Sequence, residues 1–364
     1  MKTALLSVAV VFLLLLQGSD LRCQVAPASL GGTLQDADQV AGTAAAIGGT
    51  RQRELESIVE LRGAAEAGDP LAQNNLGAAY AFGNGVERSN NEAAKWFTLA
   101  ARAGFAPAES NLGYLYEKGV GVVQDYAAAL RLYRAAAEGG NAQAQTRLGV
   151  FYENGWVVRA DEVEAVRRYR MAAELGDAEG QRKLGNCLYA GRGTQRDYAE
   201  AAKWFRKAAE QGDAASENNL GALYHHGLGL KQDYAEAMHW YKLAADQGLP
   251  GAASDVGVLY EDGAGVGKDY QEAARWYRVA AAKRVGRGEF NLARLYYAGK
   301  GVPLDYVTAY FWYSRAVADG EPLAALGLRE ISNIMTPRQK QLAQDLLAGQ
   351  QEPAMSGETV AGLK

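Results

Sequence analysis

The most reactive side chains of this 364-residue chain include three histidines: His225 and His226 are adjacent, and His239 lies on the next predicted helix. A zinc site needs ligands that converge, typically two on one helical face four residues apart. Adjacent residues of a helix point about 100° apart. We therefore interpret these histidines as surface or groove residues and predict no metal site.

The segment 263–268, Gly-Ala-Gly-Val-Gly-Lys, resembles a phosphate-binding loop. However, Asp262 stands where such a loop needs its first glycine, and Asp269 replaces the hydroxyl residue that would hold magnesium. We interpret the segment as a turn and predict no cofactor.

Recurring aspartates could suggest a row of catalytic acids, but each one precedes an amphipathic segment. A carboxylate in that position caps a helix N-terminus and contributes about 1 kcal/mol. These aspartates are Asp125, Asp161, Asp197, Asp233, Asp269 and Asp305. Cys187 aligns with leucines of the other copies, which predicts a small buried apolar residue and not a nucleophile. The sequence therefore predicts that the protein is not an enzyme.

Most of the chain is one unit that recurs every 36 residues. A Leu-Gly dipeptide or a close variant marks each copy, at 76–77, 112–113, 148–149, 184–185, 220–221, 256–257 and 292–293. A period in this range is typical of a solenoid, in which helical hairpins stack because one hairpin cannot bury its apolar face alone.

Each unit is predicted to begin with a helix that has a small residue, Leu, an apolar residue and Tyr on one face, as in Ala72, Leu76, Ala79 and Tyr80. The glycine after Leu costs an isolated helix about 1 kcal/mol relative to Ala. Because six copies retain it, we predict that a neighbouring helix packs against the bare backbone. A further glycine, such as Gly83, ends the helix.

The second helix of each unit is predicted to begin at a Ser or Asp N-cap. In five copies a Glu three residues later predicts a capping box: Glu92, Glu164, Glu200, Glu236 and Glu272. Trp recurs within this helix, at positions 96, 204, 240, 276 and 312.

Together these residues form the pattern A-x-x-x-L-G-x-x-Y-x-x-G-x-G-V-x-x-D-Y-x-x-A-x-x-W-Y-x-x-A-A-x-x-G, which resembles the Sel-1-like repeat, a relative of the tetratricopeptide repeat. The resemblance implies an all-α, right-handed α-solenoid. Seven repeats would span residues 69–320, preceded by a half-repeat helix at 51–68 and followed by capping helices at 321–349. Some cysteine-rich members of the family bind or hydrolyse β-lactams. Their repeats carry paired cysteines, which this chain lacks, so that activity is not expected.

The resemblance also implies that residues of the first helices line a concave groove. The predicted partner-binding residues are Asn75, Asn111, Tyr114, Lys118, Arg147, Lys183, Asn186, Asn219 and His226. Asn amides can bond a peptide backbone, and Arg147 or Lys183 could hold a carboxylate. An ordinary solvated face is the alternative interpretation of the same residues.

Outside the repeats, Lys2 and the apolar run 4–16 predict a cleavable signal peptide over 1–28 and no membrane span. A lipoprotein is not expected, because Asp20 and Arg22 disrupt the motif before Cys23. The segment 29–50 is predicted to be a flexible linker and 350–364 a disordered tail. We thus expect a secreted or periplasmic protein.

Basic and acidic residues, 38 and 42 in number, are mixed along the chain, so no nucleic-acid partner is expected. The resulting hypothesis is an exported, non-enzymatic scaffold or adaptor that binds a protein or peptide ligand through its concave face, in envelope assembly, secretion or host interaction. Two alternatives remain. One is a cell-wall, polysaccharide or β-lactam-associated enzyme or carrier, for which Trp156 suggests stacking on a cell-envelope polysaccharide. The other is a structural spacer.

Overall fold

The computed structural model describes residues 49–349, and all of its regular elements in that range are α-helices. The first helices of the seven repeats are α3 (Pro70–Phe82), α5 (Ala106–Lys118), α7 (Ala142–Asn154), α9 (Ala178–Ala190), α11 (Ala214–His226), α13 (Pro250–Asp262) and α15 (Gly286–Ala298). The second helices are α4 (Asn90–Arg102), α6 (Tyr126–Glu138), α8 (Glu162–Glu174), α10 (Tyr198–Ala209), α12 (Tyr234–Asp246), α14 (Tyr270–Ala282) and α16 (Tyr306–Ala318).

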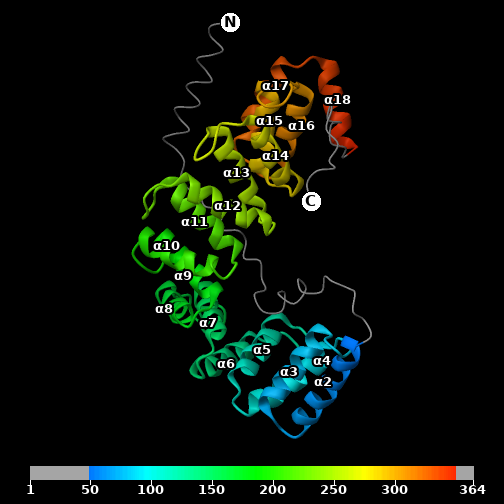
Figure 1. The fold of residues 1–364 in the computed structure, drawn as a ribbon, viewed down its shortest axis with the longest axis vertical. Coiled ribbons are helices and arrows are strands. Elements are labelled where there is room, and N and C mark those ends of the chain that lie inside the picture. Colours follow the sequence, from blue (N-terminus) through cyan, green and yellow to red (C-terminus); the bar gives the residue numbers. More distant parts are fainter. Residues whose placement is uncertain (1–48, 350–364) are drawn as a thin grey trace.

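These hairpins stack in chain order into a curved array that runs from α2 (Gly49–Glu66) at one end to α18 (Pro337–Ala348) at the other (Figure 1). Each helix packs against its hairpin partner and against the next hairpin. The predicted all-α solenoid of seven repeats is confirmed.

Helix boundaries follow the capping residues. The Asp125 carboxylate accepts hydrogen bonds from the amides of Ala127 and Ala128, and the other N-cap aspartates of the second helices do the same at their own helix starts. The first helices end on a glycine in the left-handed conformation, as at Gly119 with φ 68°.

The predicted capping boxes form only in part. Ser89 and the N-cap aspartates accept from the third backbone amide, but the Glu side chains have other partners. Glu200 accepts from the Trp204 indole and from Arg170, while Glu236 accepts from Trp240. In these two helices the tryptophan four residues later donates to the Glu carboxylate, which in a capping box would accept from the N-cap amide. A box with both halves is present at the start of α18, between Thr336 and Gln339.

In the first six hairpins the core contains an aromatic ring that lies on a glycine. A Cβ built on Gly77, Gly113 or Gly221 would lie 2.8, 2.9 or 2.7 Å from the ring of Phe97, Tyr133 or Tyr241 of the second helix. The same contact recurs at Gly149, Gly185 and Gly257. Each of these rings is at most 2% exposed. The prediction that a neighbouring helix packs against this glycine is confirmed, and the group that packs there is the ring of the same hairpin.

Cys187 occupies the leucine position of its repeat and is 6% exposed, as predicted. Burial raises the pKa of its thiol to about 11. The thiol therefore stays protonated and acts as a small apolar group.

The second turn glycine of each repeat lies against the preceding repeat. A Cβ on Gly121 would overlap the backbone carbonyl of Asn90 at the start of α4. Val157 stands at this position in the third repeat and keeps the left-handed conformation, with φ 62°. This conformation costs an L-residue about 1–2 kcal/mol, so the turn between α7 and α8 is strained and its side chain projects to the surface.

At the two ends, α2 lies at the place of the predicted half-repeat, and α17 (Ala324–Ile334) and α18 follow the last hairpin. The predicted signal peptide, nearly all of the predicted linker and the predicted tail lie outside the described residues. Within 49–349, no helix is both long enough and apolar enough to cross a membrane.

We predict that Gly221→Ala destabilises the protein by about 1–3 kcal/mol, because the added methyl group would overlap the Tyr241 ring in a packed core. Gly63→Ala is the matched control, since nothing lies within 4 Å of a Cβ on that exposed helical glycine. It should stabilise by about 0.5–1 kcal/mol. Urea unfolding followed by circular dichroism measures both. Equal and small effects would contradict the role of the glycine in packing.

Candidate partner-binding face

The first helices form the inner layer of the curved array. Consecutive first helices approach one another, α7 with α9, α13 with α15 and α15 with α17. In a curved stack the layer whose members lie closest is the concave one. Polar side chains also join successive first helices, as between Asn111 and Asn74 and between Asn219 and Asn186. The predicted groove residues all lie on these first helices, within α3, α5, α7, α9 and α11.

In the first two repeats, Asn75 is exposed and Asn111 and Tyr114 are half-buried. The Asn111 amide donates to Asn74 Oδ1 at 3.0 Å, across the junction between α3 and α5. Lys118 lies beside the Tyr114 ring and forms a 2.6 Å ion pair with Glu117. This end of the face thus presents amides and an aromatic ring, with its lysine already paired.

In the middle repeats, Arg147 and Lys183 have partners within the protein. Arg147 is 8% exposed and forms a 2.7 Å ion pair with Glu179 of α9. Lys183 Nζ donates to Glu153 Oε2 of α7 at 3.1 Å. These two cations hold α7 to α9, so the expected binding of a partner's carboxylate would compete with an existing ion pair.

Burial lowers the pKa of Arg147, but Glu179 and further acidic neighbours together outweigh burial, and the pKa is raised. For Glu153, burial would raise the pKa, whereas hydrogen bonds from Tyr169 and Lys183 lower it overall. Arg147 and Glu153 are therefore both charged at neutral pH. Glu179 compensates the charge of Arg147, and Lys183 that of Glu153.

A buried Glu–Tyr pair supports this layer in three repeats. The tyrosine that lies on the hairpin glycine donates to a Glu at the end of the first helix, at 2.8 Å from Tyr133 to Glu117 and 2.6 Å from Tyr169 to Glu153. The third pair is Tyr277 and Glu261, at 2.8 Å, which Arg294 joins at 3.1 Å.

Our sequence-based prediction missed these glutamates, although a signal was present. Each lies 16 residues before a tyrosine, whereas Phe97 and Phe205 are preceded at the same spacing by Ala81 and Tyr189, which are not acidic. In these three repeats the acid and the hydroxyl provide each other with a partner, whereas Tyr241 and Tyr313 follow His225 and Tyr297 at the same spacing.

In the later repeats, the Asn219 amide donates to Asn186 Oδ1 at 3.2 Å, and His226 is exposed. His226 stacks on His225 with ring centroids 4.5 Å apart. Burial lowers the pKa of both imidazoles, to about 4 for His225, so both are neutral at pH 7. Within 49–349 no group of His, Cys, Asp and Glu could hold a metal ion.

The cations of this part of the face are paired as well. Arg287 of α15 donates to Asp255 of α13 at 2.8 Å. Asp255 stands at the repeat position of Arg147, and Arg287 stands at that of Glu179. The ion pair therefore joins the same two positions, with the acid and the base exchanged. Charge on the inner layer is thus used between neighbouring repeats.

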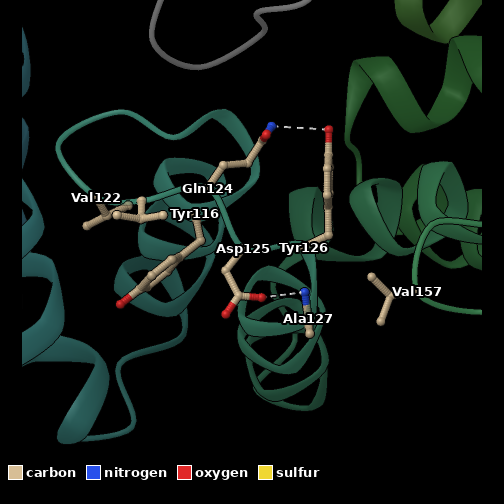
Figure 2. A pocket seen from close by; sticks show the side chains of 8 residues that line it. Tyr116, Val122, Gln124, Asp125, Tyr126, Ala127 and Val157 are labelled. Atoms are coloured by element: carbon tan, nitrogen blue, oxygen red, sulfur yellow. Dashed lines mark hydrogen bonds between the residues drawn. The ribbon is translucent and has the colours of Figure 1, made fainter.

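A shallow hollow of about 790 Å³ lies near the turn of the second repeat (Figure 2). Tyr116 and Tyr126 line it together with Asp125, and Val157 of the third repeat lies across from them. Asp125 caps α6, and Gln124 bonds the Tyr126 hydroxyl at 3.2 Å. Trp156 does not line this hollow. Its ring is half-buried and packs 5.2 Å from Tyr126 and 5.5 Å from Phe151.

This architecture, with stacked hairpins and a continuous polar inner layer, defines the protein as a repeat scaffold of the α-solenoid class. The Sel1 repeat pattern matches seven consecutive segments: 70–105, 106–141, 142–177, 178–213, 214–249, 250–284 and 286–321. The chain therefore belongs to the Sel1 repeat family, and the resemblance noted in the sequence is confirmed. Sel1 repeat proteins are generally non-enzymatic scaffolds that bind proteins.

Several solved structures are similar to this chain. A Sel1 repeat protein from Oxalobacter formigenes is 32% identical, with a TM-score of 0.56, over 63% of this chain and 99% of its own. A protective antigen of uropathogenic Escherichia coli, c5321, is 28% identical over 85% of both chains, with a TM-score of 0.40. The immunity protein Pa5087 from Pseudomonas aeruginosa is 21% identical over 58% of this chain and 81% of its own, with a TM-score of 0.40. No curated protein matches this chain significantly.

We predict that Arg147→Ala lowers the free energy of unfolding by about 1–3 kcal/mol, because it leaves Glu179 without its partner in a poorly solvated place. Arg167→Ala is the matched control, since the Arg167 side chain is 65% exposed and pairs with Glu164 within one helix. It should change the free energy by at most about 0.5 kcal/mol. Urea unfolding of both variants tests this, and losses of the same size would show that the Arg147 pair does not couple α7 to α9.

Proposed function

We propose that this protein is an exported, non-enzymatic adaptor that binds an extended segment of a protein partner along its concave face, in envelope assembly, secretion or host interaction. The observation that supports this most is the continuous inner layer of seven repeats, which presents amides and rings at regular intervals. Asn75, Asn111, Tyr114 and Asn219 are the residues on which binding would depend most, since each is exposed or half-buried there.

The pairing of charges favours one kind of contact. Lys118, Arg147 and Lys183 each have an acidic partner at 2.6–3.1 Å, so a charged ligand would first have to displace that partner. Asparagine amides can donate to and accept from a peptide backbone without that cost. The partner would thus be held mainly through its main chain and apolar side chains.

The test is capture of a partner from envelope extract by the full-length protein, compared with a variant carrying Asn75→Ala, Asn111→Ala, Tyr114→Ala and Asn219→Ala. We expect the variant to lose the partner, and the wild-type complex to survive 0.5 M salt because few free charges contribute. Circular dichroism should show that the variant is folded.

A control variant with Arg131→Ala and Lys203→Ala changes exposed residues of the second helices α6 and α10 and should keep the partner. Retention by the groove variant, with loss by this control, would place binding on the outer layer and overturn the proposal. Dissociation of the wild-type complex at 0.5 M salt would contradict main-chain recognition.

Export rests on the sequence before the repeats, where an apolar run at 4–16 follows Lys2. We predict that expression of the complete chain in a Gram-negative host yields a mature protein that lacks residues 1–28 and is released with the periplasmic or secreted fraction. Mass spectrometry of the purified protein measures the processing site. A cytoplasmic protein that retains the first 28 residues would contradict export, whatever the result of the binding experiment.

A further inference from the structure

One position of the first helix carries an amide side chain in some repeats and an acidic side chain in others. It follows directly after the small buried residue near the start of the helix. It is Gln in three repeats, Gln73, Gln145 and Gln181, and Glu in three others, Glu109, Glu217 and Glu289. The position faces the end of the preceding second helix, so it lies at the junction between two consecutive repeats.

The glutamines show what this position does. Gln73 Nε2 donates to the carbonyl of Ala65 at 3.1 Å, Gln145 to that of Ala137 at 3.4 Å and Gln181 to that of Ala173 at 3.2 Å. Each acceptor lies eight residues earlier, in the last turn of a helix, and also accepts from a glycine amide of the following turn. The amide thus bonds the start of one repeat to the end of the previous one.

An ionised glutamate at the same place cannot donate. It also puts a negative charge beside the negative end of a helix, which is unfavourable. Glu217 is 3% exposed and its Oε2 is buried without a hydrogen-bond partner. Glu109 is half-buried, and Glu138 adds a like charge.

Glu289 is fully buried and faces charged groups from the next helix. Arg315 of α16 forms a 2.9 Å ion pair with it and also donates to the carbonyl of Ala281 at 3.3 Å. Asp319, at the end of α16, adds a like charge near Glu289 and pairs with Arg284. Neither Glu289 oxygen has a hydrogen-bond partner, and the nearby carboxylate disfavours its ionised form.

The pKa values follow this geometry. Burial is the main cause that raises the pKa of all three glutamates, and a neighbouring carboxylate adds to it: Glu138 at Glu109, Asp213 at Glu217 and Asp319 at Glu289. Arg315 lowers the pKa of Glu289, but this pKa still reaches about 7. Gln247 donates to Glu217 at 2.8 Å and opposes the shift there.

We propose that Glu109, Glu217 and Glu289 make the coupling between consecutive repeats depend on pH, so that three junctions become stronger when the solution is weakly acidic. A protonated Glu109 or Glu217 donates to the carbonyl of Ala101 or Ala209, as glutamine does in the other repeats. A protonated Glu289 no longer repels Asp319. Release of the proton removes these bonds, leaves a buried charge at Glu217, and leaves a buried carboxylate between Arg315 and Asp319 at Glu289.

The sign follows from linkage. A carboxyl whose pKa is higher in the folded state than in the unfolded state stabilises the protein fully below the unfolded value of 4.5, and this contribution is lost as the pH rises through the folded value. For Glu289 the loss is therefore complete only above about pH 7.

The test compares thermal unfolding of the full chain with that of the variant Glu109→Gln, Glu217→Gln and Glu289→Gln at pH 5 and pH 8. Because other groups also titrate in this range, the informative quantity is the difference in Tm between the two proteins at each pH. We expect the variant to unfold about 3–6 °C higher at pH 8, and this difference to fall by at least half at pH 5. A difference that is absent, or equal at both pH values, would overturn the proposal.

Two further variants test the proposal separately from the triple variant. Gln181→Glu should create the same dependence in a repeat that lacks it, with a lower Tm at pH 8 that recovers at pH 5. Glu60→Gln changes an exposed residue of α2 and should leave Tm unchanged at both pH values. A loss in Gln181→Glu of the same size at both pH values would mean that the position matters only for packing.

Discussion

The contact between an aromatic ring and a bare glycine backbone is the constraint on which the rest of this structure depends. It lets the two helices of a hairpin approach so closely that a methyl group on Gly113 or Gly221 would overlap a ring. The last hairpin keeps the principle in another form, since Ala293 replaces the glycine and the Tyr313 ring lies on Gly327 of α17 instead. Because every hairpin has nearly the same thickness, the hairpins stack in one regular array, and the first helices form a continuous layer.

The same rings connect packing with the polar inner layer. Where the ring is tyrosine, its hydroxyl needs a buried partner, and Glu117, Glu153 and Glu261 provide one. Those carboxylates in turn attract Lys118, Lys183 and Arg294. The inner layer therefore has two tasks at once, since its charged residues hold neighbouring repeats together while its asparagines and rings remain accessible to a partner.

Much of the fold could be predicted from the sequence because the pattern is repeated seven times. The N-cap aspartates, the terminating glycines and the buried position of Cys187 depend on local geometry or on alignment between copies, and each was predicted correctly. The capping boxes were predicted less well, because a Glu that is free in an isolated helix bonds Trp204 or Trp240 in the folded protein. The predicted groove residues do lie on one layer, yet their pairing was not apparent, since Arg147 and Glu179 belong to different repeats and are 32 residues apart.

By itself, the sequence determined the helical hairpin, its length and the number of copies, because caps, turn glycines and apolar spacing act within a few residues of one another. Only the tertiary structure decided which charged side chains are paired within the protein and which carboxyl groups are protonated. Whether Arg147 faces a ligand or Glu179, and whether Glu289 keeps its proton beside Asp319, depends on how one repeat is placed on the next. That placement sets the distances between charges and their removal from water, and both quantities arise only when the hairpins stack.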